Sequence, residues 1–469
     1  MIIKKISFLE AGSPGLHIFS KFPLPRLGAV LLSTMVRDRG YNTRVFVEDL
    51  AEPDWSFIES SDLVGISTIT STAVRAYAIA DRIRALGIPV VMGGPHVTFL
   101  AEEALEHADF VIRGEGEASL LELLKYLEKG KPVLSDIKGL SYRGKDGKKY
   151  HNPPGEFIQN LDRLPEPDFS LVHKWKPSNI YPISTSRGCP YGCKFCSVIQ
   201  MFGRKYRFKS VEATLREMKK ATSVSKATKF IVDDNFAAEP GRTKEILRGI
   251  LAEKIKMCWS TQVRVDVAKD KELVRLLADS GCHTLYIGFE SINPATLQAY
   301  NKKQGLEDII TCIRILKDYG IHIHGMFVLG ADTDNLDTIR QTTDFASQHG
   351  IDTVQFLILT PLPGTPLFYD LVENQRLLHT DWSKYDAHHV VHKPALLSPV
   401  LLQVETFKAM ARFYSWKYIL RHLATLHFRY AALGLFGKTT IRRFLKGCAA
   451  EFQQLGFQNC NSSALKREI

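Results

Sequence analysis

The segment CPYGCKFC, residues 189–196, carries the densest chemical signal in this chain. It spaces three thiols as C-x3-C-x2-C, at Cys189, Cys193 and Cys196, and no fourth cysteine lies nearby. No cysteine precedes Cys189, and the others are scattered singly. A tight cysteine cluster in a reducing compartment is typical of metal binding or catalysis, whereas single cysteines in apolar segments are usually small core residues.

The triplet directly follows a predicted strand, YPISTSRG, so we expect it on a strand-to-helix loop. Three thiolates can hold three irons of a cubane iron–sulfur cluster and leave the fourth iron open. A structural zinc site normally has four ligands, so a zinc ion here would need a distant fourth group. Three unrelated buried cysteines are the remaining interpretation of this spacing.

Six strand–helix units follow one another from about residue 181 to residue 375. Their strand candidates are YPISTSRG, KFIVDDNF, CWSTQVRVD, TLYIGFES, IHIHGMFVLG and TVQFLILTP. Helical stretches separate them; one of these carries Ile309, Ile313 and Leu316 on a single face. Six units are too few for a closed eight-fold barrel, so we predict an open, partial (β/α)6 barrel.

The pattern C-x3-C-x-aromatic-C on the first loop of a partial barrel resembles the radical S-adenosylmethionine (radical SAM) enzymes. The resemblance implies that Cys189, Cys193 and Cys196 ligate a [4Fe-4S] cluster whose open iron binds SAM. It also places Phe195 near the adenine of SAM. The implied reaction is reductive cleavage of SAM to a 5′-deoxyadenosyl radical, which abstracts hydrogen from an unactivated carbon.

By the same resemblance, two further strand ends are candidate SAM contacts. Gly288, Glu290 and Ser291 end the fourth strand, where Glu290 would bind the ribose or the amino group of SAM. A solvated acid beside a helix cap is the structural alternative. Asp234 ends the second strand, where the family's amino contact lies, although the Gly-Gly-Glu sequence usual there is absent. Turn chemistry alone also explains the Asp-Asp-Asn sequence at this place.

The first 130 residues also alternate strand and helix signals. Strands are predicted at ISFLEAG, TRVFVED, DLVGIST, IPVVMGG and ADFVIRG, and helices at LGAVLLSTMVRDRGY, VRAYAIADRIRALG and VTFLAEEALEH. This alternation predicts a parallel sheet covered by helices, with ligands at the carboxyl ends of the strands. Three loops follow strands there, with the candidate residues Ser67, Thr70, Gly93, Gly94, Pro95, His96, Gly114, Glu115, Gly116 and Glu117.

With these loops, the first region resembles the cobalamin-binding domain of the B12-dependent radical SAM enzymes. The resemblance implies that the ten loop residues contact cobalamin, because glycines let a backbone approach a bulky ligand closely. The Asp-x-His-x-x-Gly motif of mutase-type B12 proteins is absent, and we interpret His96 as a hydrogen-bonding loop residue rather than a cobalt ligand. A generic doubly wound domain serving packing or another ligand is the alternative.

We therefore predict an α/β protein with four parts. Residues 1–130 form a Rossmann-like cobalamin-binding domain, and residues 131–180 form a linker with a hairpin that turns at Asp146-Gly147. Residues 181–375 form the radical SAM partial barrel, and residues 376–469 form a C-terminal helical region.

The implied function is that of a cobalamin-dependent radical SAM enzyme, most simply one that methylates an unactivated carbon. Its cofactors would be a [4Fe-4S] cluster, SAM and cobalamin. Ring formation or rearrangement without methyl transfer is an alternative outcome, and a cobalamin- or redox-sensing binding protein is an alternative of another class. Methylthiotransfer is disfavoured, because those enzymes carry a second cysteine triplet before the barrel.

Charge and hydropathy bear on partners and location. The net charge is +11, and residues 401–469 contribute eleven Lys/Arg against three Asp/Glu, interleaved with aromatic residues. This tail could lie on an anionic membrane surface, or it could be an ordinary cap on the barrel. We expect a small-molecule substrate, lipid-like substrates included, an electron donor such as flavodoxin or ferredoxin, and no nucleic acid. Neither a signal peptide nor an apolar run of about 20 residues is visible, so we expect a cytoplasmic protein.

Overall fold

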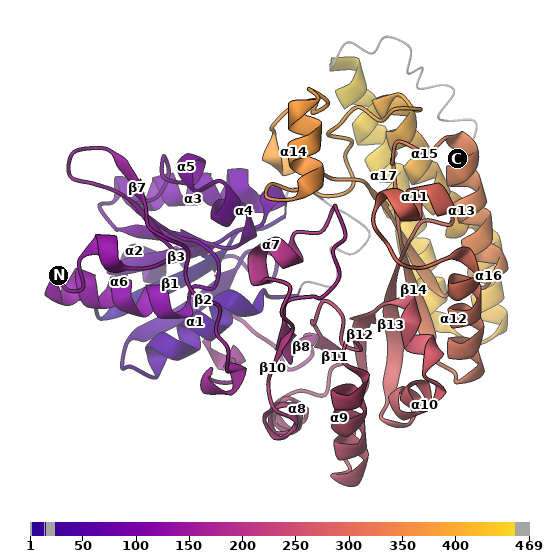
Figure 1. The fold of residues 1–469 in the computed structure, drawn as a ribbon, viewed down its shortest axis with the longest axis horizontal. Coiled ribbons are helices and arrows are strands. Elements are labelled where there is room, and N and C mark those ends of the chain that lie inside the picture. The colour runs from indigo at the N-terminus through magenta and orange to yellow at the C-terminus, as the bar shows by residue number, and fades with distance from the viewer. Residues whose placement is uncertain (1, 14, 16–23, 455–469) are drawn as a thin grey trace.

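The computed structural model describes residues 2–13, 15 and 24–454. It contains two sheets, each covered by helices, which Figure 1 shows next to each other, the N-terminal sheet in indigo and purple and the second in magenta to red. The α/β class predicted from the sequence is confirmed.

The first sheet has seven strands in the order β2-β1-β3-β4-β5-β6-β7, of which β1 to β5 are parallel. The predicted hairpin turns at Gly147, where φ is +79°, and its two strands extend this sheet: β6 pairs antiparallel with β5, and β7 pairs antiparallel with β6. The strands are β1 (Lys5–Glu10), β2 (Asn42–Val47), β3 (Leu63–Ser67), β4 (Val90–Gly93), β5 (Phe110–Ile112), β6 (Leu140–Arg143) and β7 (Lys149–His151).

Helices cover both faces of this sheet. Ile6 and Phe8 of β1 pack in one core with α1 and α6, whereas Leu9 packs in a second core with α3, α4 and α5. This alternation follows from the period of two in a strand. The helices are α1 (Leu27–Arg37), α2 (Trp55–Glu59), α3 (Ala73–Ala85), α4 (Pro95–Phe99), α5 (Ala101–Ala104) and α6 (Glu117–Lys129). The single helix predicted at VTFLAEEALEH is wrong, because the backbone leaves helical geometry at Leu100.

The second sheet is the predicted open barrel, with six parallel strands in the order β8-β11-β12-β13-β14-β15. The first predicted strand is shorter than expected, because its end forms β9 (Ser186–Arg187), which pairs antiparallel with β10 (Arg207–Phe208). The six strands are β8 (Tyr181–Ile183), β11 (Lys229–Ile231), β12 (Trp259–Val263), β13 (Cys282–Glu290), β14 (His322–Leu329) and β15 (Thr353–Ile358).

Helices lie between and after these strands. Ile309, Ile313 and Leu316 of α12 are buried, as their spacing predicts. Tyr414, the residue after α15, lies against the last strand, β15. Its hydroxyl donates to the Val354 carbonyl at 3.0 Å. The helices are α7 (Val198–Phe202), α8 (Val211–Val224), α9 (Pro240–Ala252), α10 (Lys271–Asp279), α11 (Pro294–Ala299), α12 (Leu306–Asp318), α13 (Leu336–Gln348), α14 (Pro366–Glu373), α15 (Pro399–Phe413), α16 (Trp416–Ala424) and α17 (Phe428–Gln454).

The segment between α14 and α15 returns to the first sheet. Trp382 joins the core formed by α3, α4 and α5, and its Nε1 donates to Glu103 Oε1 at 2.9 Å. Phe368, Tyr385 and Val391 join the same core. This segment therefore links the second sheet back to the first, in addition to the stretch of chain that runs from β7 to β8.

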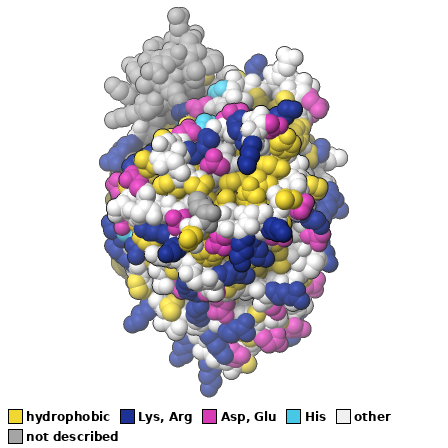
Figure 2. All heavy atoms as spheres, turned by 90° about the vertical axis from the view of Figure 1, so that its left-hand side faces the viewer, with side chains coloured by type: hydrophobic (Ala, Val, Ile, Leu, Met, Phe, Trp, Pro, Cys, Tyr) yellow, Lys and Arg dark blue, Asp and Glu magenta, His cyan; other side chains and the backbone are white. Residues whose placement is uncertain are grey.

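The surface on the side of the first sheet carries charges of both signs. Figure 2 shows Lys and Arg interspersed with Asp and Glu over this face, with hydrophobic side chains between them. Within the described ranges, no helix combines the length and the apolar composition that crossing a bilayer requires.

Candidate functional site

The three clustered cysteines lie on the loop between β9 and α7, at the carboxyl end of the second sheet. Cys193 is buried, Cys189 and Cys196 are partly exposed, and all three are free thiols. Burial raises the pKa of Cys189, and it raises that of Cys196 to about 12, with smaller contributions from the neighbouring thiols. Cys189 and Cys196 are therefore protonated until a cationic centre displaces their protons.

The arrangement of the thiols bears on which metal group they fit. Among the residues that the structure describes, no three His, Cys, Asp or Glu side chains converge on one ion. A zinc ion needs its sulfur ligands about 2.3 Å from a single point. A cubane cluster instead offers each cysteine its own iron, so it does not require the three thiols to meet at one point.

Backbone contacts hold the cysteine loop in place. Lys194 N donates to the Tyr300 carbonyl at 3.3 Å, and Asn301 Nδ2 donates to the Gly192 carbonyl at 2.9 Å. Gly188 enters the loop with φ of +88°, and a Cβ there would lie 2.6 Å from a backbone carbonyl. Only glycine fits this position without displacing the loop.

Three of the predicted SAM residues gather beside this loop. The Phe195 ring stands edge-on to Tyr300, with centroids 5.1 Å apart. Glu290 is buried with φ of +63°, and its Oε1 accepts a hydrogen bond from Lys302 Nζ at 2.7 Å. A Cβ on Gly288 would lie 2.4 Å from that same Oε1, so Gly288 makes room for the carboxylate. Glu290 is thus a paired, buried acid rather than a solvated one.

The other two predicted SAM residues have different surroundings. Ser291 is buried, and its Oγ accepts a backbone N–H two residues on, as a structural cap would. Asp234 is exposed to a cavity between the two sheets, and its enclosure there together with the neighbouring Asp233 raises its pKa to about 7. Asp234 in turn helps to raise the pKa of Cys189 and Cys196, so it lies within electrostatic reach of the cysteine loop.

The cavity has a volume of about 380 Å³, within the range of small-molecule sites. Eight of the ten loop residues predicted on the first sheet line it: Ser67, Gly93, Gly94, Pro95, Gly114, Glu115, Gly116 and Glu117. The second sheet and its loops contribute Ser184, Ser186, Arg187, Met201, Phe202, Lys209, Val232 and Asp234. The cavity therefore opens onto both the first-sheet loops and the neighbourhood of the cysteines.

Thr70 and His96 are absent from the cavity wall. His96 is buried in α4, its Nε2 lies 3.1 Å from the Tyr77 hydroxyl, and its ring meets Trp382 edge-on at 5.2 Å. The prediction that His96 is a hydrogen-bonding residue is consistent with this geometry. No histidine of the described residues lines the cavity.

The wall suits a large, flat ligand rich in amides. Ideal Cβ atoms built on Gly93 and Gly114 would meet no atom within 3.8 Å, so the bare backbone leaves room there for a close approach. Gly94 has φ of +106° and lies so close to Thr68 that a Cβ would be 2.4 Å from its carbonyl oxygen. Glu117 Oε2 is buried without a hydrogen-bond partner and can accept an amide N–H. Corrin side chains offer such amides, so the residues present fit cobalamin.

An ion-pair network joins the loop after β5 to the second part of the chain. Arg187 Nη1 lies 3.1 Å from Glu115 Oε1, and Arg187 Nη2 donates to Glu117 Oε1 at 2.5 Å. Buried Arg207 pairs with the same Glu115 at 2.8 Å. Arg187 stands two residues before Cys189, so the network connects the cavity wall directly to the cysteine loop. The sequence did not predict this partnership, because the paired residues lie at least 70 positions apart.

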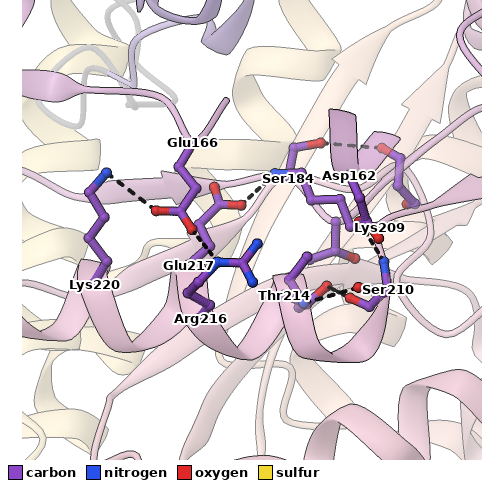
Figure 3. A network of polar contacts seen from close by, with 12 residues as sticks. Asp162, Glu166, Ser184, Lys209, Ser210, Thr214, Arg216, Glu217 and Lys220 are labelled. Carbon is purple, nitrogen blue, oxygen red and sulfur yellow. Dashed lines mark hydrogen bonds and ion pairs between the residues drawn. The ribbon is translucent and has the colours of Figure 1, made fainter. Parts of the chain in front are cut away.

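The stretch of chain between β7 of the first sheet and β8 of the second, here called the connector, forms another wall of the cavity. The sequence did not predict this wall. Figure 3 shows how it is fastened to α8: Asp162 Oδ1 accepts from Ser210 N at 2.8 Å, and Glu166 pairs with Arg216 at 3.1 Å and Lys220 at 3.3 Å. The sequence signal that could have indicated this wall was the alternation of acidic and apolar residues in a Pro-rich stretch. The cavity-facing residues of this connector are Leu161, Leu164, Pro165 and Pro167.

Comparison with known families assigns both halves of the chain. Residues 183–346 match the model of the Radical SAM superfamily, and residues 18–124 match that of the B12 binding domain. The first model implies a [4Fe-4S] cluster and SAM as cofactors, and the second implies cobalamin.

Relatives along the greater part of the chain carry the same assignment. An uncharacterized methyltransferase of Pyrococcus horikoshii is 35% identical over 77% of this chain and 81% of its own length. Bacteriochlorophyllide d C-12(1)-methyltransferase of Chlorobaculum tepidum is 32% identical over 75% of each chain. The solved structure of the radical SAM methyltransferase TsrM from Kitasatospora setae, with cobalamin and a [4Fe-4S] cluster bound, has the same fold. Its TM-score is 0.72 at 17% identity, over 94% of this chain and 100% of that chain.

Proposed function

The chain belongs to the cobalamin-dependent radical SAM methyltransferase family, and from this premise we propose that it methylates an unactivated carbon of a small molecule. One observation supports the proposal most directly. A single cavity is lined both by the glycine-rich loops of the first sheet and by Asp234 and Arg187 next to the cysteine loop. Reactants held there would be close together, which favours transfer between them.

We propose that Cys189, Cys193 and Cys196 ligate the cluster, and that SAM lies between this loop and the end of β13. A cluster held by these thiols would supply the electron that cleaves SAM to a hydrogen-abstracting radical, and cobalamin would pass on a methyl group taken from another SAM. Phe195 would pack on the adenine, and Asp234, Gly288, Glu290 and Ser291 would fix the rest of SAM. Lys302 orients Glu290 through their 2.7 Å contact.

The first-sheet loops would hold cobalamin mainly through backbone. Gly93 and Gly114 leave room for the ring, and the unpartnered Glu117 oxygen would accept an amide N–H from it. Arg187 holds the Glu117 side chain in place. Thr70 and His96 would act by shaping their loops, since neither borders the cavity.

The remaining wall favours an apolar substrate. Leu32, Leu161, Leu164, Met201 and Phe202 line it, so a lipid-like or other largely hydrophobic molecule is the substrate class we propose. A one-electron donor such as flavodoxin or ferredoxin would supply the reducing electron. Free thiols and a cluster both suit a reducing compartment, which supports a cytoplasmic location.

The test uses anaerobic protein reconstituted with iron, sulfide and hydroxocobalamin, then gel-filtered. We expect about four irons and one cobalt per chain. With dithionite and SAM labelled at the methyl group, we expect both 5′-deoxyadenosine and S-adenosylhomocysteine, with label in the cobalamin fraction. Formation of 5′-deoxyadenosine without S-adenosylhomocysteine would indicate a radical reaction without methyl transfer. Cofactor binding with neither product would overturn the enzyme assignment in favour of a sensor.

A further inference from the structure

Large apolar side chains are exposed along the α16–α17 hairpin, far along the chain from the cavity. Their exposed fractions run from 42% to 72%, and they fall within 20 consecutive positions. Exposed apolar residues are ordinary when they are scattered singly, but a contiguous group marks an interaction surface. We call this group the hairpin patch: Trp416, Leu420, Leu423, Leu426, Phe428 and Leu435.

The patch has a helical geometry with a clear inner and outer face. Trp416, Leu420 and Leu423 follow the i, i+4, i+7 spacing that puts side chains on one side of α16. The opposite side of α16, including Tyr418 and Ile419, is buried against the rest of the protein. The helix already buries one apolar face in the core. Its other apolar face, on the outside, is therefore not a core face that has failed to pack.

The position of α16 is fixed by specific contacts. The Tyr418 hydroxyl donates to the Asp352 carbonyl at 2.7 Å, which ties α16 to the start of β15. A Cβ on Gly434 would lie 2.9 Å from the Tyr418 ring, so glycine lets α17 lie close against α16. The hairpin patch is thus presented by a docked element.

The charged side chains of the hairpin itself, as far as residue 444, all have one sign. Residues 414–444 contain no Asp or Glu and six basic residues, namely Lys417, Arg421, Arg429, Lys438, Arg442 and Arg443. Lys438 Nζ lies 5.5 Å from the centre of the Trp416 ring, so a cation stands directly beside an exposed aromatic residue. Apolar residues with a basic rim match the boundary between anionic headgroups and acyl chains.

We propose that the α16–α17 hairpin is a peripheral docking surface for an anionic lipid bilayer. Trp416, Leu420 and Phe428 would enter the headgroup region, and Lys417 and Arg429 would meet lipid phosphates. A second copy of the chain is a poorer occupant, because a two-fold interface brings identical basic rims together. This inference does not depend on the radical chemistry proposed above.

The placement of the hairpin suits such a role. In Figure 1, α16 lies at the right-hand edge of the molecule, on the side away from the first sheet. The cavity lies between the first-sheet loops and the cysteine loop, so docking through α16 would leave it uncovered. The inference therefore concerns where the enzyme works, and it does not require that the hairpin handles substrate.

The experiment is vesicle co-sedimentation of the full-length, cofactor-loaded protein. We expect binding to phosphatidylcholine vesicles that contain phosphatidylglycerol to be at least about 10-fold stronger than to phosphatidylcholine alone, and to weaken in high salt. Leu420→Ser with Phe428→Ser should lower binding at least about 10-fold. Lys417→Gln with Arg429→Gln should lower it roughly 5-fold per residue, and only on anionic vesicles.

The matched control changes exposed apolar residues on another helix. Val74→Ser with Leu86→Ser in and after α3, where the exposed fractions are 48% and 53%, should leave vesicle binding unchanged. Melting temperature and bound iron confirm that each variant is folded. Equal binding to both vesicle types, or an equal loss in the control, would overturn the proposal. So would a concentration-dependent dimer that Leu420→Ser abolishes while the unmodified protein ignores vesicles.

Discussion

The cysteine loop and the loops of the first sheet border the same region, but they are built from different materials. The cysteine loop presents reactive side chains, Cys189, Cys193 and Cys196, on a backbone held by hydrogen bonds. The first-sheet loops present mainly backbone, because Gly93, Gly94 and Gly114 carry no side chain at all. One region should therefore fail when a functional group is removed, and the other when a group is added.

The largest effect is expected from removing a thiol. Any one of Cys189→Ala, Cys193→Ala or Cys196→Ala leaves an iron without its ligand, so bound iron should fall from about four per chain to near zero, and deoxyadenosine formation with it. Iron analysis and the visible absorption of the cluster measure this. Cys258→Ala changes an exposed cysteine outside the loop and is the control. Full iron content in any of the three loop variants would remove that residue from the proposed ligand set.

The ion-pair network that joins the two regions should show the next largest effect. Glu115→Gln keeps the shape of the side chain but leaves buried Arg207 without the carboxylate it pairs with, at a cost of about 3 kcal/mol in folding stability. Denaturant titration and cobalt retention measure the loss. Glu59→Gln breaks the exposed pair with Arg82 and should cost under about 1 kcal/mol. Equal losses of folding stability in the two variants would mean that the buried network stabilises the protein no more than an exposed ion pair does.

The backbone region is tested by adding one methyl group. Gly94→Ala places a Cβ 2.4 Å from the Thr68 carbonyl oxygen at φ of +106°, so we expect a loss of about 2–4 kcal/mol and weaker cobalamin binding. Gly114→Ala has φ of +77° and no atom within 4 Å of the new Cβ, so it should cost only about 1–2 kcal/mol of folding stability. Melting curves distinguish the two variants, whereas bound cobalt should fall in both, because the methyl group on residue 114 would fill space proposed for the cobalamin ring. If Gly114→Ala were the more damaging change, close packing of the loop would not be the reason for the glycines.

The same difference explains what the sequence could predict. Thiol spacing and strand alternation are local patterns, so the cysteine loop, the six parallel strands and the glycines after β4 and β5 could be predicted from short windows. Contacts across the chain could not. Trp382 meets Glu103 across 279 positions, and no local pattern marks either residue as a partner. His96 is predicted as a cobalamin-contacting loop residue because it follows Gly94 in sequence. Its place inside α4 instead turns it toward Tyr77.

The domain boundaries and the individual ligand contacts stay predictions for the same reason. The hairpin after residue 130 had a readable turn, but nothing in its sequence indicated that β6 would pair with β5 and extend the first sheet. Likewise, residues 152–168 of the connector contain four prolines, which favour irregular structure, and nothing in this stretch indicated that Leu161 and Leu164 would line the cavity. Sequence patterns identify an element more readily than they identify the surface against which it packs.

The remaining effect appears only when the pH is changed, and it concerns a buried side chain within the first-sheet region. Glu10 ends β1 and is buried, and burial raises its pKa to about 7, despite the opposing effect of Arg26. Because the folded protein holds the proton more tightly than the unfolded chain, Glu10 favours folding at low pH. That contribution is lost as the pH rises from about 4.5 through 7. Glu10→Gln stays neutral, so its stability relative to the unmodified protein should rise by up to about 3 kcal/mol between pH 5 and pH 8.

Melting temperatures at the two pH values measure this difference. Glu52→Gln, at an exposed acid of the same sheet region, is the control and should show no such change with pH. If Glu10→Gln altered stability equally at pH 5 and pH 8, its effect would come from the contact between its carboxylate and Arg26 N rather than from burial of a charge. The carboxylate would then hold the start of α1 in place, and the first-sheet region would depend on a side chain after all.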